Sequence, residues 1–423
     1  MYLAYRLVLY LLFPVVILRL LGRGFRNRNY WSRWSERFGF IPENRRGPYR
    51  AWVHAVSVGE VKAASPILEI LLENFEGQPV LVTTMTPTGA MEVEQLFGHR
   101  VDHLYLPYDY PGVIRRFLKL TAPQVAIIME TEIWPNLIEA CFQQKLPVVY
   151  TNVRLSERSF QGYLRFGRLT GQALSRVDRF AVQSSVDAER IITLGAEPTQ
   201  VTVTGSVKFD IRRPASIREV AEALRRELGW ERNIWVAGST HEGEEEQLLE
   251  AYRQLHLRFP DLLLVIVPRH PERFTQAYRL AKKGGFEVRR HSEQRGALKE
   301  SIQIYIGDTM GELAVFLAAA DVAFIGGSLV ATGGHNILEV SAAGVPVIFG
   351  PYMFNFQEIA TITLDHNAGV QVKDGGELAD RVGDYLSDPE SRDRAGEAGR
   401  KMVEENRGAV ERVLGVLEPY LHD

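Results

Sequence analysis

The fold is decided by Asp321-Val-Ala-Phe-Ile-Gly-Gly-Ser-Leu-Val-Ala-Thr-Gly-Gly-His-Asn-Ile-Leu-Glu339 and by the stretch just after it, Ala343-Gly-Val-Pro-Val-Ile-Phe-Gly350. An apolar strand runs into a glycine-rich turn, and we expect a helix to open there with His335, Asn336 and Glu339 in its first turn. Backbone N–H groups and the positive end of a helix would then point at one place, which suits a phosphate. Asn336 and Glu339 would share one helical face, and a carboxylate there can accept hydrogen bonds from a ribose diol. The stretch predicts a nucleotide site, with an ordinary strand-turn-helix corner as the alternative.

Size and composition indicate a cytosol-facing globular protein of more than one domain. The chain has 423 residues, 46% of them hydrophobic and 24% charged, with a net charge of -3. This length predicts two or three domains, and the net charge argues against general nucleic-acid binding. Cys141 is the only cysteine, so no intrachain disulfide can form and a reducing compartment is expected. No Cys/His cluster has zinc spacing, and we expect no metal.

The N-terminus combines an apolar run with a basic stretch. Leu7–Leu18 carries no charge and lies between Arg6 and Arg19, and the chain from Arg19 to Arg50 has nine arginines and no lysine. The run is shorter than the roughly 20 residues of a clean span, but residues 1–21 could cross the bilayer or lie in its interface. We therefore predict a membrane anchor over residues 1–22, with the body on the cytoplasmic side because of the arginines. A buried amphipathic helix with a solvated basic loop is the alternative.

Short β-rich runs alternate with amphipathic helical stretches along the rest of the chain. Several runs are apolar throughout, which is typical of parallel strands covered on both faces, so the pattern predicts doubly wound α/β sheets. We expect an N-terminal domain over residues 23–211, a linker near Lys208–Pro214, and a C-terminal domain over residues 212–423 whose last helix packs back on the N-terminal domain. The expected strands are Ala51–Ser57, Val80–Met85, His103–Pro107, Val125–Glu130, Val148–Asn152, Arg179–Gln183, Val201–Thr204, Ile234–Ser239, Leu262–Pro268, Glu287–Arg290, Ile302–Gly307, Val322–Gly326 and Val345–Phe349.

Three places in the first half carry chemistry-bearing side chains after a strand. Glu60 starts a helix, where the dipole would hold a carboxylate ionised and ready to take a proton from a sugar hydroxyl. Ser57 and Glu60 also match a capping box, which is the structural alternative. Glu130 and Glu132 follow a buried strand, either as site residues or as a polar cap on the strand end. Lys208 could neutralise charge on a leaving phosphate, or be a solvated linker lysine.

The second half offers three strand-end loops with suitable groups, namely Pro268–Arg269, Met310–Glu312 and Gly333–Glu339. Arginine donates a planar fork to a phosphate, Thr309 can cap a helix, and Gly311 permits close approach of a ligand. Each loop alone fits a simple turn, whereas their convergence on one sheet edge points to a ligand site. No Asp-x-Asp pair, P-loop or nucleophile elbow occurs, which disfavours metal-dependent single-domain glycosyltransferases, P-loop kinases and hydrolases of the elbow class.

Longer motifs extend this pattern over nearly the whole chain and resemble the 3-deoxy-D-manno-octulosonic acid (Kdo) transferases of Gram-negative bacteria. The motifs are His54-Ala-Val-Ser-Val-Gly-Glu60, Thr83-Thr-Met-Thr-Pro-Thr-Gly89, Pro107-Tyr-Asp109, Glu130-Thr-Glu-Ile-Trp-Pro-Asn136, Asn152-Val-Arg-Leu-Ser156, Gly205-Ser-Val-Lys208, Gly238-Ser-Thr-His241, Pro268-Arg-His270, Gly307-Asp-Thr-Met-Gly-Glu312 and Gly334-His-Asn-Ile-Leu-Glu339.

The resemblance implies a GT-B fold, in which two Rossmann-like domains face a cleft, and transfer of Kdo from CMP-Kdo to the tetraacylated lipid A precursor (lipid IVA) at the cytoplasmic face of the inner membrane. It implies a single inverting displacement without a metal or other cofactor, with Glu60 as general base and Glu130 and Lys208 stabilising the transition state. The implied CMP contacts are Pro268, Arg269, Met310, Gly311, Glu312, Asn336, Ile337, Leu338 and Glu339.

Two other functions stay open on the sequence. One is a GT-B transferase or epimerase that uses a UDP-sugar, and the other is a non-catalytic membrane protein that binds a sugar nucleotide. Competition between CMP and UDP would separate the first from a Kdo transferase.

Overall fold

The computed structural model describes residues 2–26, 28–75, 77–211 and 216–421. The chain forms two compact units, unit 1 with residues Met1–Asp210 and Arg407–Asp423, and unit 2 with residues Ile211–Asn406. Part of the expected linker, residues 212–214, lies outside the described residues.

Unit 1 is built on a sheet that contains seven parallel strands among the described residues, in the order β3-β2-β1-β4-β5-β6-β7. Alternate residues of its strands enter two separate apolar clusters: Trp52 and Ile128 belong to one, and Val53 and Ile127 to the other. Both faces are therefore covered, as the unbroken apolar runs of the sequence predict. The strands are β1 Ala51–His54, β2 Val80–Thr84, β3 Asp102–Tyr105, β4 Ala126–Met129, β5 Val148–Val153, β6 Arg179–Val182 and β7 Val201–Val203. The helices are α1 Tyr2–Arg26, α2 Val58–Asn74, α3 Pro87–Phe97, α4 Pro111–Thr121, α5 Pro135–Gln143, α6 Glu157–Leu164, α7 Gly167–Leu174, α8 Ser185–Thr193 and α17 Ala409–Leu417.

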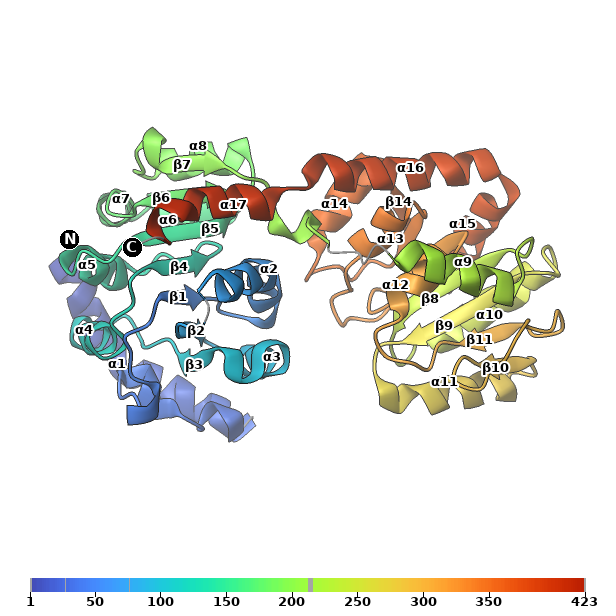
Figure 1. Cartoon of the computed structure of the whole chain (residues 1–423), viewed down its shortest axis with the longest axis horizontal. Helices are drawn as coiled ribbons and strands as arrows, with labels where there is room; N and C mark the ends of the chain where they lie inside the picture. Colours follow the sequence, from blue (N-terminus) through green and yellow to red (C-terminus); the bar gives the residue numbers. More distant parts are fainter. Residues whose placement is uncertain (1, 27, 76, 212–215, 422–423) are drawn as a thin grey trace. The chain divides into compact units, whose positions relative to one another are not determined.

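Unit 2 repeats the same plan with a second parallel sheet, ordered β10-β11-β9-β8-β12-β13-β14. In both units the ribbon shows the sheet lying between layers of helices (Figure 1). The strands are β8 Ile234–Thr240, β9 Leu263–Pro268, β10 Val288–Arg290, β11 Ile304–Ile306, β12 Val322–Ile325, β13 Val347–Phe349 and β14 Gly369–Gln371. The helices are α9 Ile217–Leu228, α10 Glu245–His256, α11 Pro271–Lys283, α12 Leu313–Ala318, α13 Leu338–Ala343, α14 Gln357–Asp365, α15 Gly375–Ser387 and α16 Pro389–Asn406. Short 3-10 turns are η1 Arg28–Tyr30, η2 Trp34–Phe38, η3 Glu43–Arg45, η4 Gly98–Arg100, η5 Pro198–Gln200, η6 Val207–Phe209 and η7 Glu418–Tyr420.

The predicted fold class is confirmed: the chain folds into two doubly wound, parallel α/β units. Every strand expected from the sequence forms, within a few residues at its ends. Strand β14 was not predicted, because Gly369-Val-Gln371 is only three residues long and its glycine weakens the strand signal. That glycine has a packing reason, since a Cβ at Gly369 would lie 2.3 Å from the carbonyl oxygen of Val347 on β13.

The C-terminal helix α17 belongs to unit 1 rather than to unit 2. The carboxylate of Asp210, at the end of the Val207–Phe209 turn, accepts hydrogen bonds from Gly408 N at 2.6 Å and from Val410 N. Two of the first N–H groups of α17 are thus satisfied by a residue from the other end of unit 1. Arg412 of the same helix donates to the carbonyl oxygen of Thr204 at 2.8 Å, which fixes α17 behind the turn that carries Lys208.

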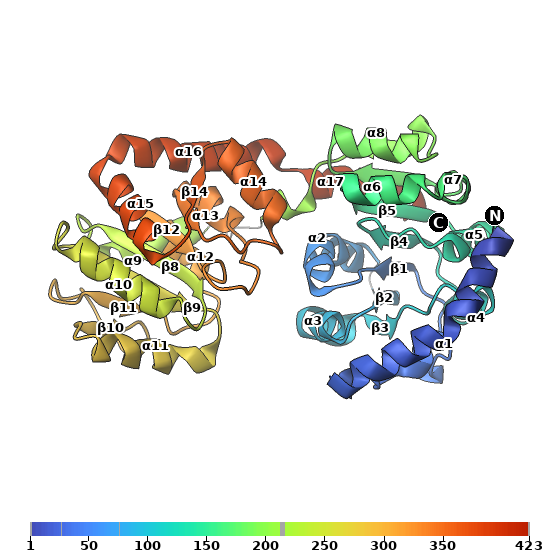
Figure 2. The ribbon, with the colours of Figure 1, turned by 180° about the vertical axis from the view of Figure 1, so that it is seen from behind.

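Helix α1 continues to Arg26, beyond the boundary expected at residue 22, and lies along the side of unit 1 (Figure 2). Polar contacts hold it there: Tyr5 Oη donates to Asp109 at 2.9 Å, and Arg6 Nε donates to Asn136 Oδ1 at 2.9 Å. An 18-residue window within Tyr2–Phe25 has a mean hydropathy of 2.0, so the helix is long and apolar enough to cross a membrane by length and composition. That property alone is weak support for an anchor.

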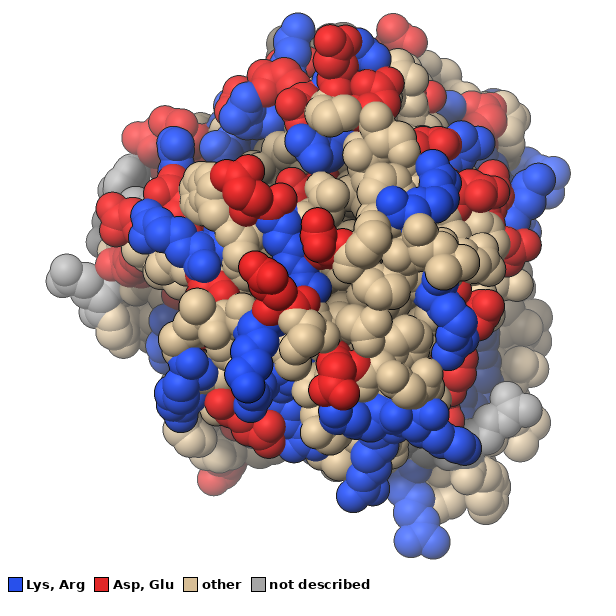
Figure 3. Space-filling view, turned by 90° about the vertical axis from the view of Figure 1, so that its right-hand side faces the viewer, with Lys and Arg blue, Asp and Glu red and all other residues tan. Residues whose placement is uncertain are grey.

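Charged side chains of both signs share the face of unit 2 that Figure 3 shows. On this face Lys and Arg lie interspersed with Asp and Glu, as the near-balanced count of 49 basic and 52 acidic residues leads one to expect.

Candidate functional site

The reversal of strand order places a candidate site in each unit. In unit 1, β1 pairs with both β2 and β4, and in unit 2, β8 pairs with both β9 and β12. Successive helices leave opposite faces of the sheet at such a switch point, which opens a crevice at the carboxyl ends of the strands where α/β proteins bind ligands. Glu60 and Glu130 follow β1 and β4, and His241 and Gly326 follow β8 and β12. The site residues predicted from sequence thus lie at or beside these two edges.

Glu60 lies in the first turn of α2 and is buried, with 8% of its surface exposed. Its carboxylate accepts a hydrogen bond from Val56 N at 2.7 Å and another from Ser57 Oγ at 3.0 Å. The capping box considered from the sequence does not form, because the Ser57 side chain accepts no hydrogen bond from the helix. The Glu60 carboxylate instead binds the N–H of Val56, the residue before the cap, and this holds it near the end of β1.

The expectation that the helix dipole keeps Glu60 ionised is wrong in this environment. Burial raises the pKa of Glu60 to about 7, and repulsion from Glu130 and Glu132 adds to the rise, while the hydrogen bonds from Val56 and Ser57 oppose it. Desolvation of a carboxylate outweighs the few tenths to about 1 kcal/mol that a helix end supplies. A carboxyl group that titrates near neutrality is suited to accept a proton and release it again.

Glu130 and Lys208 are brought together from distant parts of the chain. Lys208 Nζ lies 3.7 Å from Glu130 Oε1, and both side chains keep about a quarter to a third of their surface exposed, 26% and 32%. Glu130 directly follows β4 and has a φ of 56°, a left-handed conformation that is strained for a residue with a side chain. The negative charge of Glu130 also acts on Glu60, whose pKa it raises.

Asn152 positions the turn that carries Lys208, a role that the sequence did not single out. It is fully buried at the end of β5 and also has a left-handed φ, 54°. Its Oδ1 accepts a hydrogen bond from Val207 N at 3.2 Å, next to Lys208. Asparagine tolerates the left-handed region better than most residues, which is a sequence signal that could have found it.

In unit 2 the first part of the glycine-rich turn after β12 binds a carboxylate of the protein itself. Gly327 N, Ser328 N and Leu329 N donate to the carboxylate of Glu244 at 2.7, 3.0 and 2.9 Å, and His241 N donates to it at 2.9 Å. Glu244 is completely buried, so the N–H groups of Gly327, Ser328 and Leu329 are satisfied within the fold. Gly326 is required there, because a Cβ would lie 2.5 Å from Ser239 O and 2.7 Å from Glu244 Oε2.

The helix after this turn starts later than the sequence indicates. Helix α13 begins at Leu338, so His335 and Asn336 precede it, and only Glu339 lies in its first turn. Asn336 Oδ1 accepts a hydrogen bond from Leu338 N at 3.1 Å. The side chains of Ile337 and Leu338 are fully buried in the core, so of these two residues only the backbone can reach a ligand.

A cationic and imidazole-rich corner forms where β8, β9 and β12 end. Pro268 ends β9, and the next N–H, of Arg269, donates to Thr240 O at 3.1 Å. His241 Nε2 lies 2.7 Å from His335 Nε2 with the rings stacked, and the ring of His270 meets that of His241 edge-on at 5.5 Å. Burial lowers the pKa of His241, and the nearby His270, Arg269 and Arg273 lower it further.

The third loop, Met310–Glu312, follows β11, the neighbour of β9. Met310 is 58% exposed and Gly311 has a φ of 83° with open space where a Cβ would be. The sequence suggested that Thr309 caps the next helix, but it does not. Helix α12 begins at Leu313, and Glu312 is at its cap position. Thr309 Oγ1 donates to Glu312 instead, and His291 Nε2 lies 3.3 Å from the same carboxylate.

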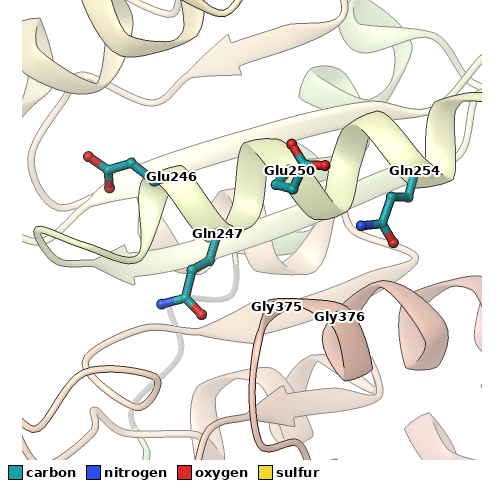
Figure 4. A pocket seen from close by; sticks show the side chains of 6 residues that line it. All are labelled: Glu246, Gln247, Glu250, Gln254, Gly375 and Gly376. Carbon is teal, nitrogen blue, oxygen red and sulfur yellow. The ribbon is translucent and has the colours of Figure 1, made fainter.

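Two further features bear on the choice of site. Among the described residues no group of three or more His, Cys, Asp or Glu side chains could hold a metal ion. A pocket of about 350 Å³ lies between α10 and the start of α15, lined by acidic and amide side chains and by Gly375 and Gly376 (Figure 4). The N–H groups of Gly376 and Glu377 there already donate to Asp374 Oδ1, so these two groups are not available to a ligand in the hollow.

Comparison with known proteins agrees with both units. Residues 32–211 match the family described as 3-deoxy-D-manno-octulosonic-acid transferase (kdotransferase), and residues 234–402 match glycosyl transferases group 1. A 3-deoxy-D-manno-octulosonic acid transferase of Haemophilus influenzae is 39% identical over 94% of this chain and 93% of its own length. The chain belongs to the Kdo transferase family.

Two solved structures are similar to this Kdo transferase family member. The C-terminal CMP-Kdo binding domain of WaaA from Acinetobacter baumannii is 33% identical, covers 48% of this chain and 99% of its own, and has a TM-score of 0.41. A putative UDP-N-acetylglucosamine 2-epimerase from Listeria monocytogenes covers 89% of this chain and 97% of its own at 14% identity, with a TM-score of 0.52. The second likeness concerns the fold alone, which is of the GT-B type. The resemblance stated from sequence is confirmed, and the protein is a glycosyltransferase.

The Glu244 carboxylate should be essential to the stability of this family member, because four buried N–H groups depend on it. We expect Glu244→Ala to lower the free energy of unfolding of the full chain by at least about 3 kcal/mol, since each buried N–H left without a partner costs roughly 1–3 kcal/mol. Glu246→Ala, an exposed residue two positions along, should change it by less than about 0.5 kcal/mol. Urea unfolding followed by circular dichroism would measure both, and equal stability of Glu244→Ala and the parent would refute the role.

Proposed function

We propose that this protein transfers Kdo from CMP-Kdo to the tetraacylated lipid A precursor (lipid IVA) by a single inverting displacement, at the cytoplasmic face of the inner membrane. The observation that supports it most is in unit 1, where Glu60 titrates near pH 7 beside the Glu130–Lys208 pair. The family membership supplies the sugar that is moved. The donor nucleotide, the lipid and the stereochemistry are the proposed parts.

In the proposed reaction Glu60 acts as the general base. A sugar hydroxyl is a poor nucleophile. A base that removes its proton in the transition state typically raises the rate by a factor of about 10²–10⁴. The hydrogen bonds from Val56 and Ser57 hold the carboxylate at the end of β1 and stabilise its charged form. Because burial disfavours that charged form, the free energy gained on taking a proton is larger than for an exposed glutamate.

Glu130 and Lys208 would stabilise charge as the bond to the leaving group breaks. The ammonium group of Lys208 can neutralise negative charge, and Glu130 keeps it in place through their 3.7 Å pair. Carboxylates near the anomeric centre can also stabilise positive charge on the sugar ring. The contact between Val207 N and Asn152 fixes the turn, so that the lysine is placed before substrate binds.

In unit 2 we place the cytidine monophosphate near Arg269. Its guanidinium can bind phosphate oxygens in a fork, beside His241 and His335. Pro268, the Met310–Glu312 loop and the segment Asn336–Glu339 would complete the nucleotide contacts, with the backbone rather than the side chains of Ile337 and Leu338 involved. We expect the guanidinium of Arg269 to balance the charge of the bound phosphate, with no metal ion needed.

The anchor proposed for this enzyme is helix α1, lying in the membrane interface. Large apolar side chains are exposed over much of its surface, and those of Leu3, Leu7, Leu11, Val15 and Leu18 follow one another at intervals of three and four residues. Tyr5 and Arg6 are not among these exposed apolar residues, and their hydrogen bonds to Asp109 and Asn136 hold the helix along unit 1. An amphipathic helix with one side on protein and an apolar stripe outward is suited to embed in the lipid boundary.

The proposed reaction is tested by mass spectrometry of the lipid product. The purified full chain in detergent, given CMP-Kdo and lipid IVA, should yield lipid heavier by one or more Kdo units, and the reaction should continue in the presence of a metal chelator. Added CMP should inhibit more strongly than UDP, because the leaving nucleotide competes for the donor site. Inhibition by UDP but not CMP, or binding of CMP-Kdo without any product, would overturn the proposal in favour of a UDP-sugar enzyme or a non-catalytic binder.

The pH dependence of the transfer rate should follow the protonation of Glu60. Since its folded pKa is raised to about 7 and the base must be deprotonated, kcat/KM should fall as pH is lowered through about 7. Glu60→Gln should lower kcat by about 10²–10⁴ and remove this limb. Glu130→Gln removes a negative charge that raises the pKa of Glu60, so its remaining activity should fall only at a lower pH. An unshifted limb in Glu130→Gln would show that another group titrates.

Membrane binding should depend on the outward stripe of α1. The double variant Leu7→Asp, Leu11→Asp should bind phospholipid vesicles at least about tenfold more weakly, because two apolar contacts of roughly 1.5–3 kcal/mol each are lost. Leu257→Asp with Val220→Asp, two exposed apolar positions in unit 2, is the matched control. Flotation of protein with vesicles measures both, and unchanged flotation of the α1 variant would exclude the stripe as the anchor.

A further inference from the structure

Two histidines meet at the carboxyl edge of the unit 2 sheet. His241 directly follows β8, the strand at which the sheet order reverses, and His335 lies in the turn beyond β12. Their Nε2 atoms lie 2.7 Å apart, and their rings are within 9° of parallel. No nucleotide contact implied by the sequence motifs falls on either histidine.

The fold makes room for this pair and fixes both of its turns. Gly327 has a φ of 69°, and a Cβ there would lie 2.8 Å from Thr332 Oγ1 and 3.1 Å from Nε2 of His335. The N–H of Gly327 and the N–H of His241 both donate to Oε2 of Glu244, at 2.7 and 2.9 Å. The two turns that carry the histidines are thus tied to one buried carboxylate, so the rings are placed before any ligand binds.

The hydrogen bond between the rings determines where their protons lie. A neutral imidazole carries one N–H, and one of the two Nε2 atoms must carry it for this bond to form. The other ring then accepts at Nε2 and has its proton on Nδ1. One further proton gives both rings an N–H at Nδ1 and makes the pair a cation. Nδ1 of His241 has no hydrogen-bond partner within the described part of the chain, so it can donate to a ligand.

The charges around the pair favour an incoming anion. Burial lowers the pKa of His241, and His270, Arg269 and Arg273 lower it further, so the empty pair lacks the additional proton. Arg273 is compensated by Glu245 at 2.9 Å, whereas Arg269 forms no ion pair with a carboxylate among the residues that the structure describes. A bound anion would balance Arg269 and would raise the pKa of the pair, because a nearby opposite charge favours the protonated form.

The placement of these cations fits a donor that carries two anions. Arg269 N donates to Thr240 O at 3.1 Å, which brings Arg269, after β9, beside the residue that precedes His241. In a 2-ulosonic acid such as Kdo, the anomeric carbon bears a carboxylate as well as the bond to the leaving phosphate. The two anions are a few bonds apart, so the groups that bind them must also be neighbours. A guanidinium and a histidine pair on adjacent strands supply one cationic group for each anion.

We propose that the His241–His335 pair binds the carboxylate of the donor sugar through Nδ1 of His241, while Arg269 binds the phosphate. His335 is a positioning residue, because its hydrogen bond holds the His241 ring and fixes which nitrogen carries the proton. The pair then selects an acidic sugar over a neutral one, since a neutral sugar brings no anion to it. The inference rests on the proposed function, because it names the part of CMP-Kdo that is recognised beside the nucleotide.

The test uses two donors that differ only at the carboxylate. One is CMP-Kdo, and the other is its methyl ester, in which the carboxylate is replaced by a neutral group. Binding of each, and of CMP alone, to the purified full chain in detergent is measured by calorimetry without lipid acceptor. The variants are His241→Ala, His241→Asn and His335→Ala. His366→Ala is the matched control, because His366 is an exposed histidine of unit 2 that follows α14.

We expect the parent to bind CMP-Kdo at least about tenfold more tightly than the ester, because the ester loses a charge-assisted hydrogen bond. His241→Ala should bind CMP-Kdo about tenfold more weakly than the parent and should not distinguish it from the ester, while its affinity for CMP stays unchanged. His241→Asn, whose amide nitrogen is attached to Cγ as Nδ1 is, should recover part of the preference. His335→Ala should lose part of it, because the His241 ring is no longer held. His366→Ala should behave as the parent does.

Equal losses of CMP and CMP-Kdo affinity in His241→Ala would assign the pair to the phosphate or to the fold and would overturn the proposal. A His241→Ala protein that keeps the preference for CMP-Kdo over the ester would overturn it as well, as would a loss of that preference in His366→Ala. Equal binding of the two donors by the parent, a measurement that needs no variant, would exclude a carboxylate site.

The inference and the proposed function can fail separately. If the parent prefers CMP-Kdo over the ester but transfers no Kdo to lipid, the carboxylate assignment stands and the proposed transfer fails. If the parent transfers Kdo but binds the ester equally well, the proposed transfer stands and the carboxylate assignment fails.

Discussion

The parallel order of each sheet is the constraint on which the rest of the structure depends. Every strand of a parallel sheet ends at the same edge, so each turn that follows a strand is carried to that edge whatever its place in the sequence. Glu60 after β1 and Glu130 after β4 are 70 positions apart by their numbers and become neighbours only because β4 pairs with β1. The same rule brings His241 after β8 to His335 beyond β12. In both candidate sites the strand order brings the residues together, and the chemistry of their side chains then determines what the site can do.

This explains why so much of the fold could be predicted from the chain. Runs such as Leu262–Pro268 are apolar at every position, which is the signature of a strand covered on both faces, and their alternation with helical stretches fixes the class. The positions of Glu60, Glu130 and Arg269 at strand ends followed from the same pattern. Strand β14 was not predicted, because three residues carry too little pattern. The last helix was expected to pack back on the N-terminal domain, and α17 does belong to unit 1, but no local signal reveals that Asp210, some 200 positions away, caps it.

The errors have a common physical cause, namely burial. The glycine-rich turn after β12 has the backbone shape of an anion site, and the sequence therefore predicted a phosphate there. The N–H groups at Gly327, Ser328 and Leu329 are not available for it, because the completely buried carboxylate of Glu244 accepts their hydrogen bonds. Likewise Glu60 lies in the first turn of α2, where a helix end favours the ionised form, but burial raises its pKa to about 7. The hydrogen-bond partner of a buried group and the extent of its burial both depend on tertiary structure, so a local sequence pattern does not predict them.

Burial also separates the charged groups of this protein into two kinds. Glu244 receives four backbone N–H groups and Arg273 forms a two-pronged pair with the fully buried Glu245, at 3.2 and 2.9 Å, so these charges are compensated within the fold and serve its stability. Glu60 and Arg37 are buried to a similar degree but are compensated only in part: Glu60 faces the repulsion of Glu130, and Arg37 has an Nε without a partner. Leaving the charges of Glu60 and Arg37 only partly compensated does not stabilise the fold. A proton that binds Glu60 removes the cost of its buried charge, and this is the physical basis for proposing Glu60 as the base of unit 1.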